Sequence, residues 1–244
     1  MDKEVKNTRY MIGIDEVGRG PIAGPVAVCA FLVKDESFLG FPTSPTGGKI
    51  TGQTGDENNR EIKKLPKLRD SKKLSKKQRE EWFEYLKIAK TEGFCDFSVS
   101  FVSSENIDKF GIAKCIQKAL DESLEKVTQL VIPFMRSSDE GDGSGARPSQ
   151  KVLQVSLPIF LDGGLHAPKE YINQETIIKG DELHPVISLA SIVAKVSRDR
   201  VMEKYGKEYP EYGFEKHSGY GTRAHFEAIK RHGQTPIHRK TFIH

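Results

Sequence analysis

The sequence has few cysteines and no long apolar run. Its three cysteines, Cys29, Cys95 and Cys115, form no CxxC pair. This spacing argues against a cysteine-ligated zinc site and a disulfide framework, so we expect reduced, buried thiols. No apolar stretch approaches the roughly 18–20 residues of a membrane span. The N-terminal MDKEVKNTRY is charged where a signal peptide would be apolar. We therefore expect a cytoplasmic protein with no membrane partner.

A strong excess of one charge sign is also missing. Lys and Arg number 38 against 34 Asp and Glu, for a formal net charge of +4. This balance permits a phosphate-rich partner without requiring one. A chain of 244 residues is within the range of one α/β domain, which buries roughly 70% of its unfolded surface. We expect one domain over residues 1–244.

Several apolar stretches are typical of strands. Two runs within residues 9–33 flank a glycine-rich turn and predict a hairpin of buried strands. Residues 94–102 alternate between apolar and polar side chains, which is typical of a half-buried strand. Two later stretches predict strands that end at Asp162 and at Asp181.

Three stretches predict helices. Ser75 and Gln78 fit a capping box before a helical stretch that stops near Gly93. The stretch that begins at Pro185 has the small and apolar residues of a buried helix. Residues 111–127 place apolar side chains on one face, namely Ile112, Cys115, Ile116, Ala119 and Leu120. Strands that alternate with helices indicate an α/β domain with a mixed sheet.

Two stretches are polar and rich in turn-forming residues. Residues 37–66 are rich in Gly, Pro, Thr and Asn, and residues 136–151 are rich in Ser, Gly and Asp. Such composition predicts flexible surface insertions.

The glycine-rich segment GIDEVGRGPIAGP (13–25) raises the question of what its carboxylates do. It lacks the GK[ST] of a Walker loop, and its third glycine is one residue late for a dinucleotide fingerprint. A structural turn explains the glycines. It does not explain why Asp15 and Glu16 end an apolar strand, where a carboxylate is costly to desolvate without a positive partner. Arg19 or a divalent cation would serve as that partner.

Two further carboxylates repeat this pattern. Asp162 follows an apolar stretch and precedes two glycines, and Asp181 precedes the turn into the helix that begins at Pro185. Acidic residues at several strand exits can converge at one sheet edge and coordinate hard divalent ions. Two such ions roughly 4 Å apart suit phosphodiester hydrolysis.

Taken together, these motifs resemble the bacterial ribonuclease HII family. The matching segments occur in the family's order and span most of the chain. They are GIDEVGRGPIAGPV (13–26), RDSKKLS (69–75), LDGG (161–164), KGDELHPVISLASIVAKVSRDRVM (179–202), YPEYGFEKHSGYGT (209–222) and HRKTF (238–242).

The resemblance implies a fold and an activity. The fold is α/β and ribonuclease H-like, a mixed sheet flanked by helices with a C-terminal helical region. The activity is hydrolysis of the RNA strand of RNA–DNA hybrids and incision 5′ of single ribonucleotides in duplex DNA, which leaves 3′-hydroxyl and 5′-phosphate ends. The cofactor is Mg²⁺ or Mn²⁺, with two ions when substrate is bound. The catalytic metal ligands implied are Asp15, Glu16, Asp162 and Asp181.

The resemblance also implies which residues bind substrate. Gly18, Arg19 and Gly20 match the tripeptide whose backbone senses the ribose 2′-hydroxyl, and Tyr220 matches the tyrosine that packs on the sugar. Glycines let main-chain groups approach that hydroxyl, which distinguishes RNA from DNA. The candidates for sequence-independent phosphate contacts are Ser71, Lys72, Lys73, Ser191, Lys195 and Arg198. For a single lysine a solvated surface charge is the alternative, and for Ser191 it is helix packing.

Two further residues have structural interpretations, and the function has alternatives. We expect Asp199 to form a structural salt bridge with its arginine neighbours, and His217 to have a packing or surface role. One alternative function is a non-catalytic protein of the same fold that binds RNA–DNA hybrids. Another is the sister enzyme ribonuclease HIII, whose additional N-terminal domain is not expected here. We expect a monomer.

Overall fold

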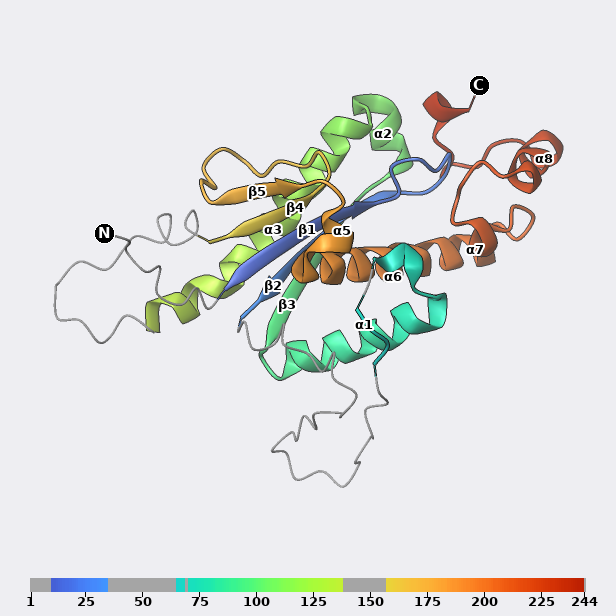
Figure 1. Cartoon of the computed structure of the whole chain (residues 1–244). Coiled ribbons are helices and arrows are strands. Elements are labelled where there is room, and N and C mark those ends of the chain that lie inside the picture. Colours follow the sequence, from blue (N-terminus) through green and yellow to red (C-terminus); the bar gives the residue numbers. More distant parts are fainter. Residues whose placement is uncertain (1–9, 35–64, 69, 138–156, 244) are drawn as a thin grey trace.

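The computed structural model describes residues 10–34, 65–68, 70–137 and 157–243 (Figure 1). The stretches predicted as insertions, 37–66 and 136–151, lie outside the described residues except at their edges. Residues 65 and 66 are described, and residues 136 and 137 belong to a helix.

Five strands form one mixed sheet in the order β3-β2-β1-β4-β5. The strands are β1 (Met11–Val17), β2 (Val26–Val33), β3 (Cys95–Val102), β4 (Ile159–Asp162) and β5 (Gln174–Ile177). The first three strands pair antiparallel, whereas β4 pairs parallel with both β1 and β5. The predicted hairpin, the strand over 94–102 and the strand ending at Asp162 are confirmed.

The predicted strand end at Asp181 is wrong. Strand β5 ends at Ile177, and Asp181 lies in a short helix, α5 (Gly180–Leu183). The chain turns because Lys179 adopts a left-handed conformation with φ of 57°. The amide of Gly180 then donates to Oδ1 of Asp162 at 2.6 Å. The turn therefore brings Asp181 back toward the end of β4.

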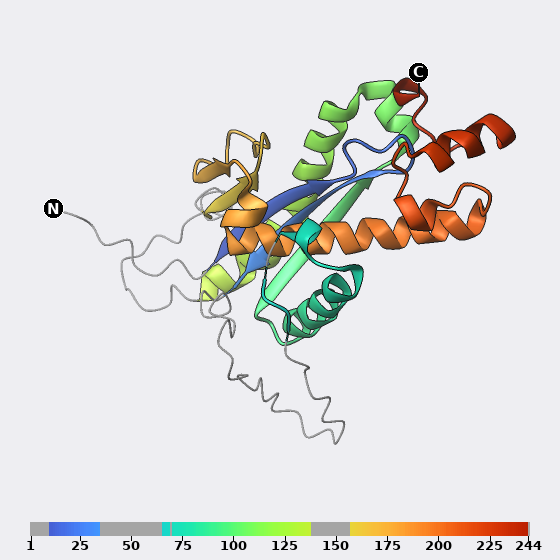
Figure 2. The same cartoon turned by 45° about the vertical axis from the view of Figure 1, so that its right-hand side comes forward.

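Helices cover both faces of the sheet (Figures 1 and 2). One face carries α3 (Ile112–Ser137), which follows α2 (Ser104–Phe110), and the other carries α1 (Lys76–Thr91) and α6 (Pro185–Glu208). Beyond one end of the sheet lie α7 (Phe214–His217) and α8 (Arg223–His232), the predicted C-terminal helical region. Two 3₁₀ helices complete the described elements, η2 (Ser71–Lys73) and η3 (Lys240–Phe242). The described chain has no helix of the length and apolarity that a membrane crossing needs.

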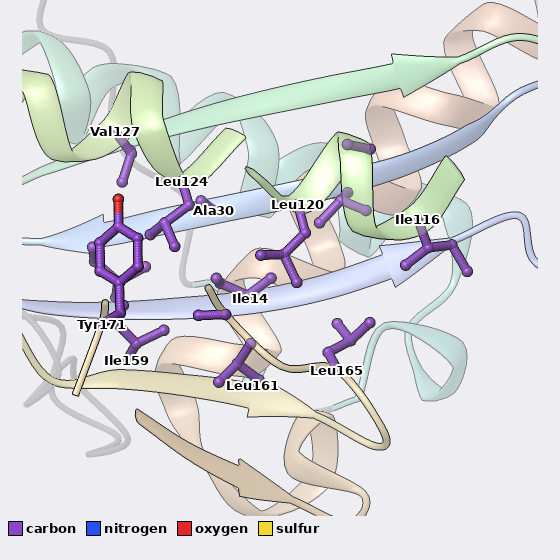
Figure 3. Close-up of a cluster of buried hydrophobic side chains, with 14 of the residues drawn as sticks. Ile14, Ala30, Ile116, Leu120, Leu124, Val127, Ile159, Leu161, Leu165 and Tyr171 are labelled. Carbon is purple, nitrogen blue, oxygen red and sulfur yellow. The ribbon is translucent and has the colours of Figure 1, made fainter. Parts of the chain in front are cut away.

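The main core lies between α3 and the sheet, where side chains from both interdigitate (Figure 3). Leu120 and Leu124 of α3 pack with Ile14 of β1 and Leu161 of β4, and all four are fully buried. Burial of each such side chain contributes about 1.5–3 kcal/mol. The predicted apolar face of this helix is confirmed, with Ile112 half-buried at its edge.

Helix α6 lies directly on the strand that carries Asp15. A Cβ added at Gly13 would stand 2.3 Å from the carbonyl oxygen of Val186, so only glycine permits this approach. The predicted capping box of α1 is present, with Ser75 accepting from the Gln78 amide. The three cysteines are free and buried, as predicted.

Candidate active site

Two of the predicted carboxylates lie side by side on neighbouring strands. Strands β1 and β4 are parallel, and Ile14 pairs with Leu161. Asp15 and Asp162 each come one residue later, so their side chains leave the sheet on the same face. Oδ1 of Asp162 also accepts from the amide of Asp181 at 3.4 Å. The strand register and one tight turn thus bring together residues far apart in the sequence.

The four carboxylates influence one another electrostatically. Burial raises the pKa of Asp15 well above its usual value, and the charges of Glu16, Asp162 and Asp181 raise it further, while a hydrogen bond from Ser191 opposes the shift. Burial and the charge of Asp162 also raise the pKa of Asp181. The pKa of Glu16 is raised by burial, against the opposing charge of Arg19. These groups form one electrostatic unit.

Cationic side chains neutralise this unit only in part. Arg19 lies 3.5 Å from Glu16, and Lys72 lies 3.3 Å from Asp181. Both cationic side chains are mostly exposed, at 61% and 79%. Within the described ranges, Asp15 and Asp162 have no salt bridge. Arg19, the possible partner predicted from the sequence, therefore pairs with Glu16, and the buried Asp15 has hydrogen bonds but no salt bridge within the described residues.

The donor set fits a hard divalent cation. It consists of carboxylate oxygens that are partly buried and repel one another, and such oxygens are the ligands that Mg²⁺ and Mn²⁺ prefer. As placed, no group of three or more His, Cys, Asp or Glu side chains in the described chain is arranged to hold a metal ion. Asp15 and Glu16 are consecutive in β1, so their side chains start on opposite faces of the sheet. Metal binding therefore requires the carboxylate side chains to draw together.

The glycines of the GRG tripeptide have different roles. Gly18 has a φ of +90°, and a Cβ there would stand 2.3 Å from Nε of Arg198. At Gly20 the nearest atom to an added Cβ is Cε1 of Tyr220, at 3.8 Å. Gly18 is thus required by the fold, whereas Gly20 leaves open space beside an exposed residue.

Tyr220 is held close to this tripeptide. The amides of Ile22 and Ala23 donate to the carbonyl oxygen of Gly219 at 2.9 and 3.2 Å. The Tyr220 ring is 48% exposed despite its size. The structure therefore brings the residues predicted to contact the ribose into one region, which begins two residues after Glu16.

The serines and lysines predicted to contact phosphate have varied environments. Ser71 and Ser191 are buried and their hydroxyls lie 2.8 Å apart, which joins η2 to α6. Lys73 pairs with Glu182 at the surface. Lys195 is half-buried and pairs with Asp199 at 2.7 Å. Lys72, beside Asp181, is the candidate most open to solvent.

Arg198 corrects the sequence-based expectation. Its side chain is fully buried, and it donates to the carbonyl oxygens of Ala23, Pro25 and Ser218. It therefore does not reach a phosphate in this arrangement, because its donors face the protein interior. The sequence showed a basic residue in a motif but not the direction in which it points.

Asp199 forms structural salt bridges and His217 has a packing role, as predicted. Asp199 forms salt bridges with Lys195 and Arg79, not with its sequence neighbours. Successive helical residues point in different directions, so the partner lies four positions away. His217 packs on the ring of His225, with centroids 4.5 Å apart.

Sequence reasoning missed three buried residues near this site. Arg239 donates to the carbonyl oxygens of Gly18 and Arg19 within the GRG tripeptide. His225 and His238 are buried and lie 3.0 Å apart through their Nε2 atoms. His238 and Arg239 belong to the HRKTF segment, which matches the family. The sequence pattern, however, did not indicate which groups they contact.

Comparison with known proteins identifies the family of the chain. The family model described as Ribonuclease HII matches residues 12–43 and 150–244. The Ribonuclease HII of Endomicrobium trichonymphae is 36% identical over 231 residues, covering 94% of this chain and 83% of the relative. The Ribonuclease HII of Clostridioides difficile (strain 630) is 34% identical over 238 residues, covering 98% and 71%.

Two solved structures share the fold. The PCNA:RNase HII complex from Archaeoglobus fulgidus matches with a TM-score of 0.60 and 23% identity, covering 96% of both chains. Bst-RNase HIII in complex with Mn²⁺ matches with a TM-score of 0.53 and 16% identity, covering 92% of this chain and 63% of the other.

The sheet order, the flanking helices and these structural matches define a ribonuclease H-like α/β protein, as the sequence predicted. Within that class, the chain belongs to the ribonuclease HII family. It is a metal-dependent endonuclease of the ribonuclease H class.

Proposed function

We propose that this protein hydrolyses the RNA strand of RNA–DNA hybrids and incises duplex DNA on the 5′ side of a single embedded ribonucleotide. The products carry 3′-hydroxyl and 5′-phosphate ends. We further propose that residues 1–244 form one catalytic domain that acts as a monomer. The observation that carries the proposal is the placement of the acidic pair Asp15 and Glu16 immediately before a glycine turn that lies against Tyr220.

The proposed metal ligands are Asp15, Glu16, Asp162 and Asp181, which would hold Mg²⁺ or Mn²⁺, two ions with substrate bound. Bound ions of this kind activate the attacking water and stabilise the departing 3′ oxygen. The mutual repulsion of the carboxylates supports this assignment, because a divalent cation relieves it. The position of Asp162 between Asp15 and Asp181 supports a central role for its side chain.

The proposed substrate contacts follow from exposure. The main chain of the Gly18–Arg19–Gly20 tripeptide contacts the ribose, where a 2′-hydroxyl distinguishes RNA from DNA. Arg19 and Gly20 are its exposed residues. The exposed ring of Tyr220 packs on the sugar. Lys72 is the leading phosphate contact, because its side chain is exposed beside the carboxylates.

The other proposed phosphate contacts are less available to substrate, because they are paired or buried. Lys73 is exposed but is paired with Glu182. Ser71 and Ser191 are buried, and Lys195 is half-buried. All three are bonded within the protein, so they act as phosphate contacts only after local rearrangement.

The test compares three duplexes that differ only in sugar chemistry: all DNA, one ribonucleotide, and four ribonucleotides in a row. Each is incubated with enzyme in EDTA, Mg²⁺ or Mn²⁺, and the products are mapped to the nucleotide. We expect cleavage 5′ of the single ribonucleotide, with either metal and not in EDTA. Binding without cleavage across the whole metal range would support the non-catalytic alternative.

A matched pair of variants locates the site. Asp162→Asn keeps the acceptor for the Gly180 amide and removes a charge. Asp121→Asn removes a charge on α3, where Asp121 accepts from Gln117 at the surface. We expect the first variant to lose cleavage by about 10³-fold or more, and the second to cleave as wild type.

A further inference from the structure

Two arginines that the proposed chemistry does not use are fully buried beside the GRG tripeptide. Arg198 comes from α6 and Arg239 from the segment before η3, and both side chains are 0% exposed. Burial lowers the pKa of Arg198 to about 10 and that of Arg239 to about 9. A buried guanidinium requires compensation for lost hydration. Here that compensation comes from main-chain carbonyl oxygens.

Arg239 bonds to the tripeptide itself. Its Nη2 donates to the carbonyl oxygen of Gly18 at 2.7 Å, and its Nη1 donates to that of Arg19 at 3.1 Å. Its Nε donates to the carbonyl oxygen of Gly24 at 3.0 Å, on the other side of the turn. One side chain thus fixes both ends of the loop.

Arg198 holds the neighbouring part of the turn. Its Nε donates to the carbonyl oxygen of Pro25 at 2.9 Å, and its Nη2 to that of Ala23 at 3.3 Å. Its Nη1 donates to the carbonyl oxygen of Ser218 at 2.9 Å, two residues before Tyr220. It therefore ties the turn to the tyrosine loop, and its hydrogen bonds in the described residues go to carbonyls other than the two tripeptide carbonyls that Arg239 binds.

The contacts of Arg239 decide where the tripeptide amides point. In a trans peptide group the C=O and the following N–H point in opposite directions. Arg239 holds the carbonyls of Gly18 and Arg19 inward, so the amides of Arg19 and Gly20 point outward. Arg19 and Gly20 are exposed. Within the described part of the chain, neither amide has a protein acceptor. Two neighbouring donors are thereby presented on the surface beside the carboxylates.

We infer that Arg239 is a positioning residue for ribose recognition. Its guanidinium orients the Arg19 and Gly20 amides toward the 2′-hydroxyl and the adjacent phosphate of the nucleotide at the cut. This inference rests on the proposed function and adds a residue through which that function distinguishes ribose from deoxyribose.

The geometry requires arginine. A planar guanidinium presents donors in a fixed fork that reaches three carbonyls at once, whereas the ammonium of lysine is a single point. The backbone around Arg239 is held independently of its side chain. Its own amide donates to the carbonyl oxygen of Ile22 at 2.8 Å, and the amides of Lys240 and Thr241 donate to Asp108. A substitution of the side chain therefore leaves the segment docked.

The test is a ratio of affinities measured on the full chain. Wild type and Arg239→Lys are titrated, in EDTA, against a labelled DNA duplex with one ribonucleotide and against the same duplex of DNA alone. We expect the variant to lose about tenfold of its preference for the ribonucleotide, and to bind the DNA duplex within twofold of wild type. An unchanged preference would overturn the inference.

Asp108→Asn is the matched control. It weakens the docking of the same segment but leaves the Arg239 guanidinium in place. We expect its preference for the ribonucleotide to equal that of wild type. An equal loss of preference in both variants would assign the effect to segment docking and overturn the role of the guanidinium.

A measurement on wild type covers the case in which Arg239→Lys does not fold. The amide resonances of Arg19 and Gly20 are followed by NMR as each duplex is added. We expect both to shift more with the ribonucleotide duplex than with DNA alone, and equal shifts would contradict the inference.

Failure of the proposed function and failure of the role of Arg239 give different results. If wild type neither prefers nor cuts the ribonucleotide, the proposed function fails, whereas a variant that keeps the wild-type preference removes only the role of Arg239.

Discussion

The Nζ of Lys72 lies 3.3 Å from Oδ2 of Asp181, although 109 positions separate the two residues. The lysine is placed by η2, where Asp70 accepts from its amide at 2.8 Å and Ser71 bonds to Ser191. The hydrogen-bonded turn thus holds an exposed cation at the edge of the acidic group. Such a lysine is free to exchange the carboxylate for a phosphate when substrate arrives.

Lys72→Gln is expected to weaken substrate binding more than it slows the chemical step. We expect KM for a ribonucleotide-containing duplex to rise by about threefold to tenfold, and the salt dependence of binding to become shallower by about one unit in log–log slope. Lys73→Gln is the control, because Lys73 is already paired with the exposed Glu182. If Lys73→Gln weakened binding as strongly as Lys72→Gln, the position of Lys72 would carry no special role.

Asp15→Asn is expected to abolish cleavage and yet stabilise the metal-free protein. The pKa of Asp15 is raised by burial and by its acidic neighbours. Because the folded-state pKa lies above the unfolded one, the stability of the metal-free protein falls as pH rises from about 4 through the raised value. At pH 7.5 in EDTA we expect the unfolding free energy of the variant to exceed that of wild type, measured by urea denaturation. A variant that was inactive and less stable would show that Asp15 supports the fold instead.

Gly18→Ala and Gly20→Ala separate a folding requirement from a substrate requirement. Gly18→Ala places a Cβ at positive φ against Arg198, so we expect a loss of about 2 kcal/mol or more in unfolding free energy. Gly20→Ala meets the Tyr220 ring at an ordinary distance, so we expect a change within about 0.5 kcal/mol. Its cleavage rate should nevertheless fall by about tenfold or more, because the new methyl group occupies the approach to the ribose. Normal cleavage by Gly20→Ala would argue against a close main-chain contact.

The sequence predicted the strands that carry the site residues better than it predicted the contacts of those residues. Apolar patterning placed Asp15 and Asp162 on strands, and parallel pairing then brought them together. The position of Asp181 depended on a left-handed turn at Lys179, a non-glycine residue for which no local signal exists. The burial of Arg198 depended on carbonyl groups from distant loops, which no periodicity reveals.

The buried histidines His225 and His238 form a row of hydrogen bonds. The groups that donate to these rings determine which ring nitrogens carry protons. The amide of Thr235 donates to Nδ1 of His238 at 2.8 Å, so the proton of that ring lies on Nε2. His238 then donates to Nε2 of His225 at 3.0 Å. His225 in turn donates from Nδ1 to the carbonyl oxygen of Tyr220 at 2.9 Å. The bond between the two histidines requires neutral rings, because a protonated His225 has no nitrogen left to accept from His238.

Acid is expected to loosen this region. Burial lowers the pKa of His225 to about 4. Because the folded-state pKa lies below the unfolded value of about 6.5, the stabilisation is complete above about pH 6.5 and is lost as pH falls toward 4. Hydrogen exchange at pH 7 and pH 5, corrected for intrinsic rates, should show reduced protection in α7 and α8 at the lower pH and unchanged protection in α3. Equal loss of protection in α3 would indicate global rather than local opening.

The central claim is that the side chains of residues 15, 16, 162 and 181 bind divalent ions together. Manganese binding followed by electron paramagnetic resonance tests it most directly, with wild type, Asp162→Asn and the surface control Asp121→Asn at equal protein concentration. We predict that wild type and the control bind Mn²⁺ alike, and that Asp162→Asn binds about 100-fold more weakly. Equal Mn²⁺ affinity in all three proteins would contradict the account.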